Sequence, residues 1–184
     1  DDQRLIELGS TGVNFIVGDS TNALIDGWSG SEKECRTGLY SVISQQPYRV
    51  AVTCFSSNTA RLSSLGNVAK STGRRISVLG RSLQNYIQIA KATGYLKEFP
   101  DLVPTCDLDY LPRSEQLILA TGSQGEPRAA MAKLAKGEHP DLVLEQGDTV
   151  VFSSKVIPGN EKKLFRLHDL LSQKQISVVT EADA

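Results

Sequence analysis

The sequence lacks the features that define several classes of protein. No window holds the 18 or more consecutive apolar residues of a membrane-spanning helix, and no charged segment leads into the apolar run of a secretory signal. The three cysteines, Cys35, Cys54 and Cys106, are widely spaced and form no CxxC pair, which is typical of reduced thiols and excludes a disulfide framework. These absences predict a cytoplasmic protein with no membrane anchor.

Histidine is also scarce, because the chain contains only His139 and His168. His139 precedes Pro140 in an expected loop and His168 sits beside a stripe of leucines, so we interpret both as structural or surface residues. No HxH, HExxH or Cys/His cluster is present, so the chain cannot supply the ligands of a zinc ion. We therefore predict no metal site and no cofactor within the chain.

The length of 184 residues suits one domain. A chain of this size buries about 70% of the surface that its unfolded form exposes, so it needs neither disulfides nor a metal to hold a core. The first residue is Asp1 rather than Met, and we expect a fragment of a longer protein.

The net charge of −1 hides an uneven distribution of charge. Residues 35–97 contain nine basic residues and no acidic one, whereas both flanking segments are acidic. One interpretation is a surface for a polyanion such as RNA. The other is a set of solvated helix faces that the flanking acids neutralise, because neighbours in sequence need not be neighbours in space.

Short β-branched, apolar runs alternate with helical patterns along the chain. We expect strands at 13–17, 49–55, 76–79, 116–120, 149–152 and 176–180, and helices at 31–45, 58–71, 82–93, 128–137 and 161–173. Residues 98–114 contain three prolines and predict a long irregular connection. This alternation predicts an α/β fold of three layers, αβα, around a mainly parallel central sheet.

Small polar residues follow each of the first five expected strands, at 18–22, 56–58, 80–82, 121–127, and 153–154 with 157–160. In a parallel sheet these exits meet at the carboxyl edge, where helix N-termini, glycine backbone and an arginine such as Arg81 favour phosphate. Any one of these loops is also explained as a helix N-cap and turn. No GxGxxG or GxxxxGK[ST] motif is present, so neither a dinucleotide nor a P-loop nucleotide is indicated.

Two acidic residues stand beside expected turns. Asp19 ends the first expected strand, where it is either a functional acid at the carboxyl edge or an Asx-turn or capping residue. Asp148 precedes the strand expected at 149–152, and we interpret it as a turn residue.

The loops resemble, in order and spacing, the β-CASP domain of ribonuclease J, a bacterial RNA-processing nuclease of the metallo-β-lactamase superfamily. The resemblance spans roughly residues 13–181 and rests on GDSTNA at 18–23, FSSN at 55–58, GRS at 80–82, TGSQGEP at 121–127, and SS at 153–154 with IPGNE at 157–161. TGSQGEP and IPGNE together carry most of its specificity. Ser56 and Leu83 differ from the Ala and Met that are common in the family.

This resemblance implies a Rossmann-like β-CASP domain over residues 13–184, truncated before its next motif. Residues 1–12 would be a linker or the tail of a metallo-β-lactamase segment, and the missing lactamase domain would hold two zinc ions. Asp19 resembles an acid that supports a catalytic histidine, which would come from a Ser-Gly-His segment beyond the chain. The parent is expected to be a homo-oligomeric exo- or endoribonuclease acting on single-stranded RNA in RNA processing and decay, and the isolated fragment is expected to be inactive.

The part implied for this chain is to position RNA in a cleft between the two domains. The expected RNA- and phosphate-binding residues are Ser57, Asn58, Arg61, Arg81, Ser82, Gly122, Ser123, Gln124, Gly125, Ser153, Ser154 and Asn160. Two other functions remain open. The chain could be a self-contained α/β enzyme that binds a small phosphorylated metabolite, or an interaction module whose basic region docks an acidic partner.

Overall fold

The computed structural model describes residues 3–18, 20, 24, 26–27 and 30–181. These residues fall into two compact units, Asp1–Gly30 and Ser31–Ala184. The first unit contains one helix, α1 (Gln3–Thr11), none of whose residues is buried. The domain boundary expected at residue 12 remains a prediction about the longer protein.

The strand expected at 13–17 is wrong for the described chain. These residues form coil and pair with no described strand, and Val13, Phe15, Ile16 and Val17 are 51–85% exposed. A β-branched run favours extended backbone, but a strand forms only where a neighbour accepts its ladder hydrogen bonds. The GDSTNA segment therefore follows no strand of the described sheet, and Asp19 lies outside the described residues.

Five strands form one parallel sheet in the order β2-β3-β1-β4-β5. Their bounds are β1 (Val50–Thr53), β2 (Arg75–Leu79), β3 (Gln116–Ala120), β4 (Thr149–Phe152) and β5 (Ser177–Val179). The central strand β1 pairs Val50 with Leu117 on one side and with Thr149 on the other. The expected parallel sheet is thus confirmed.

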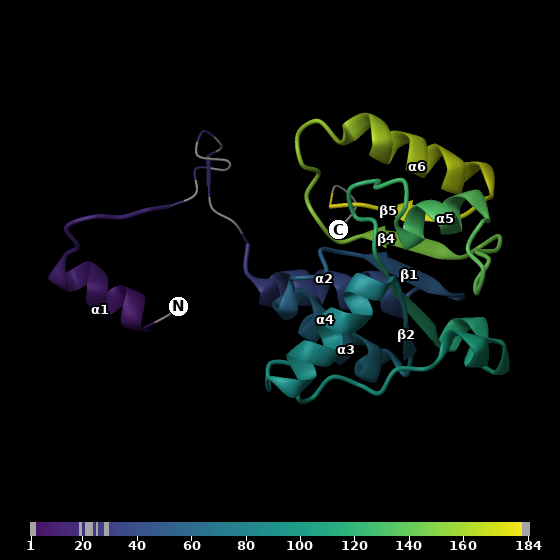
Figure 1. Cartoon of the computed structure of the whole chain (residues 1–184), viewed down its shortest axis with the longest axis horizontal. Coiled ribbons are helices and arrows are strands. Elements are labelled where there is room, and N and C mark those ends of the chain that lie inside the picture. The colour runs from purple at the N-terminus through teal and green to yellow at the C-terminus, as the bar shows by residue number, and fades with distance from the viewer. Residues whose placement is uncertain (1–2, 19, 21–23, 25, 28–29, 182–184) are drawn as a thin grey trace. The chain divides into compact units, whose positions relative to one another are not determined.

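Helices cover both faces of this sheet (Figure 1). One face packs against α2 (Glu32–Ser44), α3 (Thr59–Thr72) and α4 (Arg81–Ala92), and the other against α5 (Ala130–Lys136) and α6 (Glu161–Gln173). Side chains of β1 alternate between the two cores, with Val50 and Val52 in the first and Ala51 in the second. This is the three-layer α/β/α arrangement that the alternating pattern predicts.

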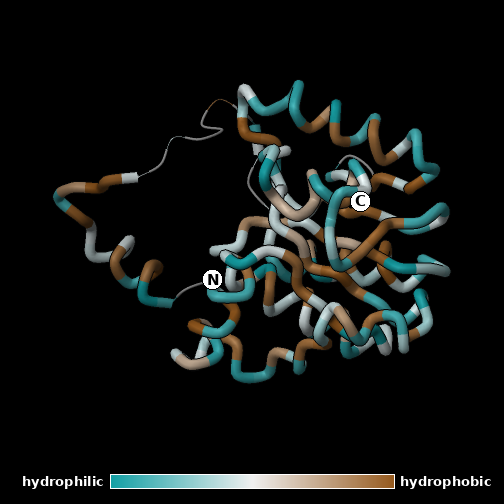
Figure 2. Tube along the Cα trace, turned by 45° about the vertical axis from the view of Figure 1, so that its right-hand side comes forward, coloured by the Kyte–Doolittle hydropathy of each residue, from teal (hydrophilic) through white to brown (hydrophobic). Residues whose placement is uncertain are grey.

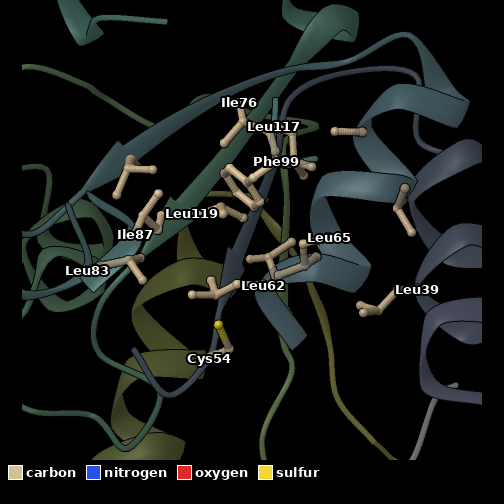
Figure 3. Packing of buried hydrophobic residues seen from close by; sticks show 14 of the residues in the cluster. Leu39, Cys54, Leu62, Leu65, Ile76, Leu83, Ile87, Phe99, Leu117 and Leu119 are labelled. Atoms are coloured by element: carbon tan, nitrogen blue, oxygen red, sulfur yellow. The ribbon is translucent and has the colours of Figure 1, made fainter. Parts of the chain in front are cut away.

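Strands β1, β3 and β4 are buried along their whole length because helices cover them on both sides. Figure 2 shows the hydrophobic positions gathered in the middle of the second unit and the hydrophilic ones on its outer helix faces. In the first core, Leu62 and Leu65 of α3 belong to the same buried cluster as Leu117 and Leu119 of β3 (Figure 3). This packing fixes where each strand ends, and so fixes the edge at which the loops emerge.

Side chains cap the first two helices of the second unit. The Ser31 hydroxyl accepts a hydrogen bond from the Glu34 N–H at 3.2 Å, and the Glu34 carboxylate accepts one from the Ser31 N–H at 2.6 Å. The Asn58 side chain caps α3 by accepting from the Arg61 N–H at 3.0 Å. By contrast, no side chain caps the N-terminus of α4, which starts after Gly80.

The connection between α4 and β3 contains two short 3₁₀ helices, η1 (Thr105–Tyr110) and η2 (Arg113–Glu115), and an isolated bridge between Ile76 and Leu102. Across the ranges that the structure describes, no helix combines the length and apolar character needed to span a bilayer.

A buried ionic network closes the amino edge of the sheet, opposite the loops. The Asp148 carboxylate is fully buried and accepts hydrogen bonds from Arg113 at 2.6 and 3.2 Å, from Arg49 at 3.1 Å and from the Glu145 N–H at 2.9 Å. Arg49 also donates to the buried Gln116 at 2.6 Å. Asp148 is therefore more than the turn residue expected, because it joins three separate segments of the chain.

Candidate functional site at the carboxyl edge

A cleft of about 750 Å³ opens at the carboxyl ends of β1, β2 and β3. We call it the carboxyl-edge cleft. The exits of the three strands supply part of its wall, as Phe55 and Ser56, Gly80 to Ser82, and Thr121 to Ser123. The rest comes from the first residues of α5, from Thr105 of η1, and from the loop at 139–141. Three of the loops that the sequence singled out are thus brought together.

Close packing of two loops shapes the floor of this cleft. Gly80 has a φ of +116°, and an added Cβ would lie 2.5 Å from the Thr121 hydroxyl oxygen. The same Thr121 hydroxyl accepts a hydrogen bond from the Ala130 N–H at 3.2 Å, and the Thr121 carbonyl accepts one from the Met131 N–H at 2.9 Å. Thr121 therefore satisfies the start of α5, while the start of α4 keeps amides that no side chain caps.

Positive charge outnumbers negative charge in the walls of the cleft. Its cationic side chains are Arg81, Arg128 and Lys133, and its carboxylates are Glu126 and Asp141. Arg81 is the first residue of α4, is exposed, and has no hydrogen-bond or ion-pair partner within the described part of the chain. Its guanidinium is therefore available to an anion at the uncapped helix N-terminus.

The cleft also contains His139, which adds no charge at neutral pH. Burial lowers the pKa of His139, and Lys133 lowers it further while Asp141 opposes the shift. The His139 Nδ1 accepts a hydrogen bond from the Asp141 N–H at 3.2 Å, which fits a neutral ring. The sequence did not predict three residues of this cleft. Arg128 and Lys133 lie in the segment expected to be a helix, beyond the strand exit, and the sequence favours a structural or surface role for His139.

The exit of β4 lines a second hollow, of about 380 Å³, between α2 and the ends of β4 and β5. Ser153, Ser154 and Arg61 lie there, away from the carboxyl-edge cleft. Arg61 pairs with Glu32 at 3.0 Å and donates to the carbonyl and hydroxyl oxygens of Ser153 at 2.7 and 2.6 Å. Arg61 of α3 therefore links α2, through Glu32, to the end of β4, through Ser153.

Burial keeps two thiols near Arg61 protonated, that of Cys35 in this hollow and that of Cys54 in the wall of the carboxyl-edge cleft. Burial raises the pKa of Cys54 to about 11, although the nearby Arg61 opposes the shift. Burial likewise raises the pKa of Cys35. Burial alone would lower the pKa of Arg61, but the hydrogen bonds that Arg61 donates to the Glu32 carboxylate, together with nearby charges, outweigh burial and raise that pKa. Neither cysteine is thus an activated nucleophile.

Gln124 joins the loop after β3 to the loop after β4. Its side chain is buried and donates to the Lys155 carbonyl at 2.9 Å and the Ser154 hydroxyl at 3.4 Å. Its amide oxygen accepts from the Ile157 N–H at 2.9 Å and from the Asn160 side chain at 3.4 Å. The TGSQGEP and IPGNE motifs are therefore linked by one side chain, and Gln124 and Asn160 contact each other.

Replacing Gln124 with alanine should lower the free energy of unfolding by about 1–3 kcal/mol, because several buried polar groups lose their partner. Urea denaturation followed by circular dichroism measures the loss. The matched control is Gln173→Ala, at an exposed position of α6, which should change stability by less than about 0.5 kcal/mol. Equal effects of the two substitutions would contradict this role for Gln124.

The remaining predicted residues differ in their surroundings. Asn58 is occupied as the cap of α3, and the Ser57 carbonyl accepts a hydrogen bond from the Tyr86 hydroxyl at 3.0 Å. Ser82 is exposed at the cleft beside Arg81, whereas Ser123 is buried in its wall. Gly125 packs against α6, where an added Cβ would lie 2.9 Å from the Lys163 Cβ.

Flanking acids neutralise part of the acid-free stretch at 35–97. Arg49 pairs with Asp148, Arg61 with Glu32, and Lys91 with Asp101 at 3.6 Å. Arg74 is buried and donates to four backbone carbonyls, two of them within 2.8 Å. Much of this positive charge therefore stabilises the fold. This agrees with the interpretation that acids from the flanking segments neutralise the basic stretch.

No group of three or more His, Cys, Asp or Glu side chains in the described ranges is arranged to hold a metal ion. The described residues therefore do not fit a zinc ion.

The fold and the cleft together define an α/β domain whose parallel sheet presents an anion-compatible edge. Residues 47–171 match the family described as "Ribonuclease J, beta-CASP domain". The chain is 38% identical to Ribonuclease J of Sinorhizobium meliloti over 184 residues, which is all of this chain and 33% of that protein. It is 41% identical to Ribonuclease J of Synechocystis over 179 residues, 96% of this chain and 28% of that protein.

Ribonuclease J of Mycobacterium tuberculosis is 38% identical over 178 residues, 96% of this chain and 32% of that protein. The chain belongs to the ribonuclease J family and contains its β-CASP domain. It spans about a third of the length of these curated relatives.

Proposed function

We propose that this chain is the RNA-positioning domain of a ribonuclease J-like nuclease, and that the carboxyl-edge cleft holds phosphates of single-stranded RNA. The observation that carries the proposal is the uncapped N-terminus of α4, where the exposed Arg81 faces a cleft with more cations than carboxylates. Family membership supports RNA as the anion, because the relatives are named as ribonucleases.

The domain contributes binding and orientation in this proposal. Backbone amides of the strand exits and the Arg81 guanidinium would hold the sugar-phosphate chain, which carries no sequence information. Phe55 is the one Phe, Tyr or Trp residue among those that line the described cleft, so stacking adds little and the domain should tolerate many sequences. Ser82, Gly122 and Ser123 belong to the same proposed surface.

The whole protein, as we propose it, hydrolyses RNA with two zinc ions held by a metallo-β-lactamase domain outside this chain. When bound, such ions supply an activated water and stabilise developing charge. The whole protein would act in the cytoplasm as a homo-oligomer. This division of labour predicts that the purified 184-residue chain does not cleave RNA. Cleavage that a chelator abolishes would contradict it.

Replacing Arg81 with alanine should weaken the binding of single-stranded RNA about tenfold and reduce the salt slope of binding by about one, because one phosphate contact is lost. Fluorescence anisotropy of a labelled 12-nucleotide RNA, measured at several salt concentrations, tests this.

The matched control is Arg75→Ala, since Arg75 is an exposed arginine of the same acid-free stretch at the opposite end of β2. It should leave both affinity and salt slope nearly unchanged. If the Arg81 variant binds RNA as tightly as the unmodified chain, with the same slope, the proposed phosphate contact is wrong.

A further inference from the structure

A shallow groove of about 200 Å³ runs between α5 and α6, and we call it the α5–α6 groove. It is separate from both hollows at the carboxyl edge, since it shares no lining residue with them. Its lining residues are Gly125, Pro127, Ala132, Lys136, Lys163, Arg166, Leu167 and Leu170.

Small and aliphatic side chains form the floor of this groove. Ala132 of α5 and Leu167 and Leu170 of α6 belong to the core on this face of the sheet or pack against it, so the floor is rigid. The backbone at Gly125 approaches α6 so closely that an added Cβ would lie 3.0 Å from the Lys163 carbonyl carbon. The volume suits one medium-sized aliphatic side chain from a partner.

Three cationic side chains, those of Lys136, Lys163 and Arg166, line the groove beside this apolar floor, and no carboxylate is among the lining residues. Arg166 has no hydrogen-bond or ion-pair partner within residues 30–181. Lys136 makes only an exposed pair with Glu138 at 3.9 Å, which contributes little, and Lys163 donates to the Asn160 side chain at 3.2 Å.

Two of the carboxylates close in sequence to the groove accept hydrogen bonds from backbone amides outside it. The Glu126 carboxylate accepts a hydrogen bond from the Gln124 N–H at 3.0 Å, and the Glu161 carboxylate accepts one from the Gly159 N–H at 2.7 Å. The lining of the groove therefore carries three cations and no carboxylate around a hydrophobic centre, with Glu138 in a weak exposed pair with Lys136 and Asp169 next to Leu170 in sequence.

We propose that the α5–α6 groove docks an acidic segment of a partner protein, with one aliphatic side chain on the floor and carboxylates against Lys136, Lys163 and Arg166. Charge complementarity selects the partner, and the buried anchor supplies affinity. A peptide fits better than RNA, because none of the lining residues is aromatic and a base would find no stacking platform.

The test uses the 184-residue chain and a fluorescein-labelled 12-residue peptide made of Glu and Gly with one central Leu. Arg166→Glu should weaken peptide binding at least tenfold, because an attraction becomes a repulsion. Replacing the peptide leucine with serine should also cost about tenfold, since burial of a leucine side chain is lost. Circular dichroism confirms that the protein variant is folded.

The matched control is Arg75→Glu, the same charge reversal at an exposed arginine that lies outside the groove. It should leave peptide binding within about twofold of the unmodified chain. Equal binding of the leucine and serine peptides, or an Arg166→Glu variant that binds like Arg75→Glu, would overturn the proposal. So would a labelled single-stranded RNA that loses affinity with Arg166→Glu while the peptide does not, because the groove would then be an RNA surface.

Discussion

Replacing Asp148 with alanine should lower the free energy of unfolding by about 3–5 kcal/mol. The Asp148 side chain is 0% exposed and receives hydrogen bonds from two arginines and one backbone amide. Without it, the Arg49 guanidinium stays buried, with a side chain 5% exposed, and its closest remaining carboxylate is Glu145 at 3.8 Å. The variant therefore leaves a buried guanidinium at the amino edge of the sheet with only one distant, half-exposed carboxylate nearby, which costs far more than a lost surface pair.

The control for this measurement is Glu145→Gln. Glu145 pairs with Arg49 and Arg113, but its side chain is 55% exposed, so solvent screens the interaction and the loss should stay below about 1 kcal/mol. Urea denaturation of both variants compares the two losses directly. A loss for Asp148→Ala no greater than that for Glu145→Gln would show that the network does not stabilise the fold as described.

A second large effect is expected at Gly122, in the wall of the carboxyl-edge cleft. Its φ is +116°, and an added Cβ would lie 2.9 Å from the Ala129 Cβ and 3.0 Å from the Met131 Cβ. Gly122→Ala should therefore cost about 2–5 kcal/mol, because backbone strain and overpacking at the start of α5 act together. Thermal or urea unfolding measures the change.

Gly38→Ala is the matched control for this glycine substitution. Gly38 lies inside α2 with ordinary helical backbone, and an added Cβ there would meet nothing within 4 Å. Alanine should stabilise the helix by about 0.5–1 kcal/mol, the usual difference in helix propensity. If both variants shift stability in the same direction and by similar amounts, then Gly122 is not held in a conformation that demands glycine.

The sequence predicts most of the fold because local and global signals agree. The runs at 116–120 and 149–152 are strands with the expected bounds, and α6 has the bounds expected for the helix at 161–173. Their apolar patterns match burial between two helical layers. The run at 13–17 carries the same composition without such burial, so composition alone could not separate it from a true strand.

The candidate site is predicted less completely than the fold, because the type of a side chain does not reveal which group it binds in the folded chain. The carboxyl ends of β1 to β3 do gather at one cleft, as parallel topology requires. Arg61 and Gln124, however, have the chemistry of phosphate ligands but bind other parts of the chain. Long-range pairs such as Arg61 with Ser153 depend on strand order, which loop lengths do not determine.

The acid-free stretch at 35–97 shows that charge along the sequence does not reveal which charges pair in the fold. Its absence of acids is real, yet Glu32, Asp101 and Asp148 reach it from outside in sequence. Arg81 remains as the unpaired cation of that stretch that lines the carboxyl-edge cleft within the described residues. It is for this reason the residue on which the proposed function depends most.

The most direct test of the proposed function is an NMR titration of the ¹⁵N-labelled 184-residue chain with a 12-nucleotide single-stranded RNA. Amide shifts should change first at residues 55–56, 80–83 and 121–123, around the carboxyl-edge cleft, and should diminish in the Arg81→Ala variant. Changes confined to the amino edge, to the outer faces of α2 and α3, or to the α5–α6 groove would contradict it.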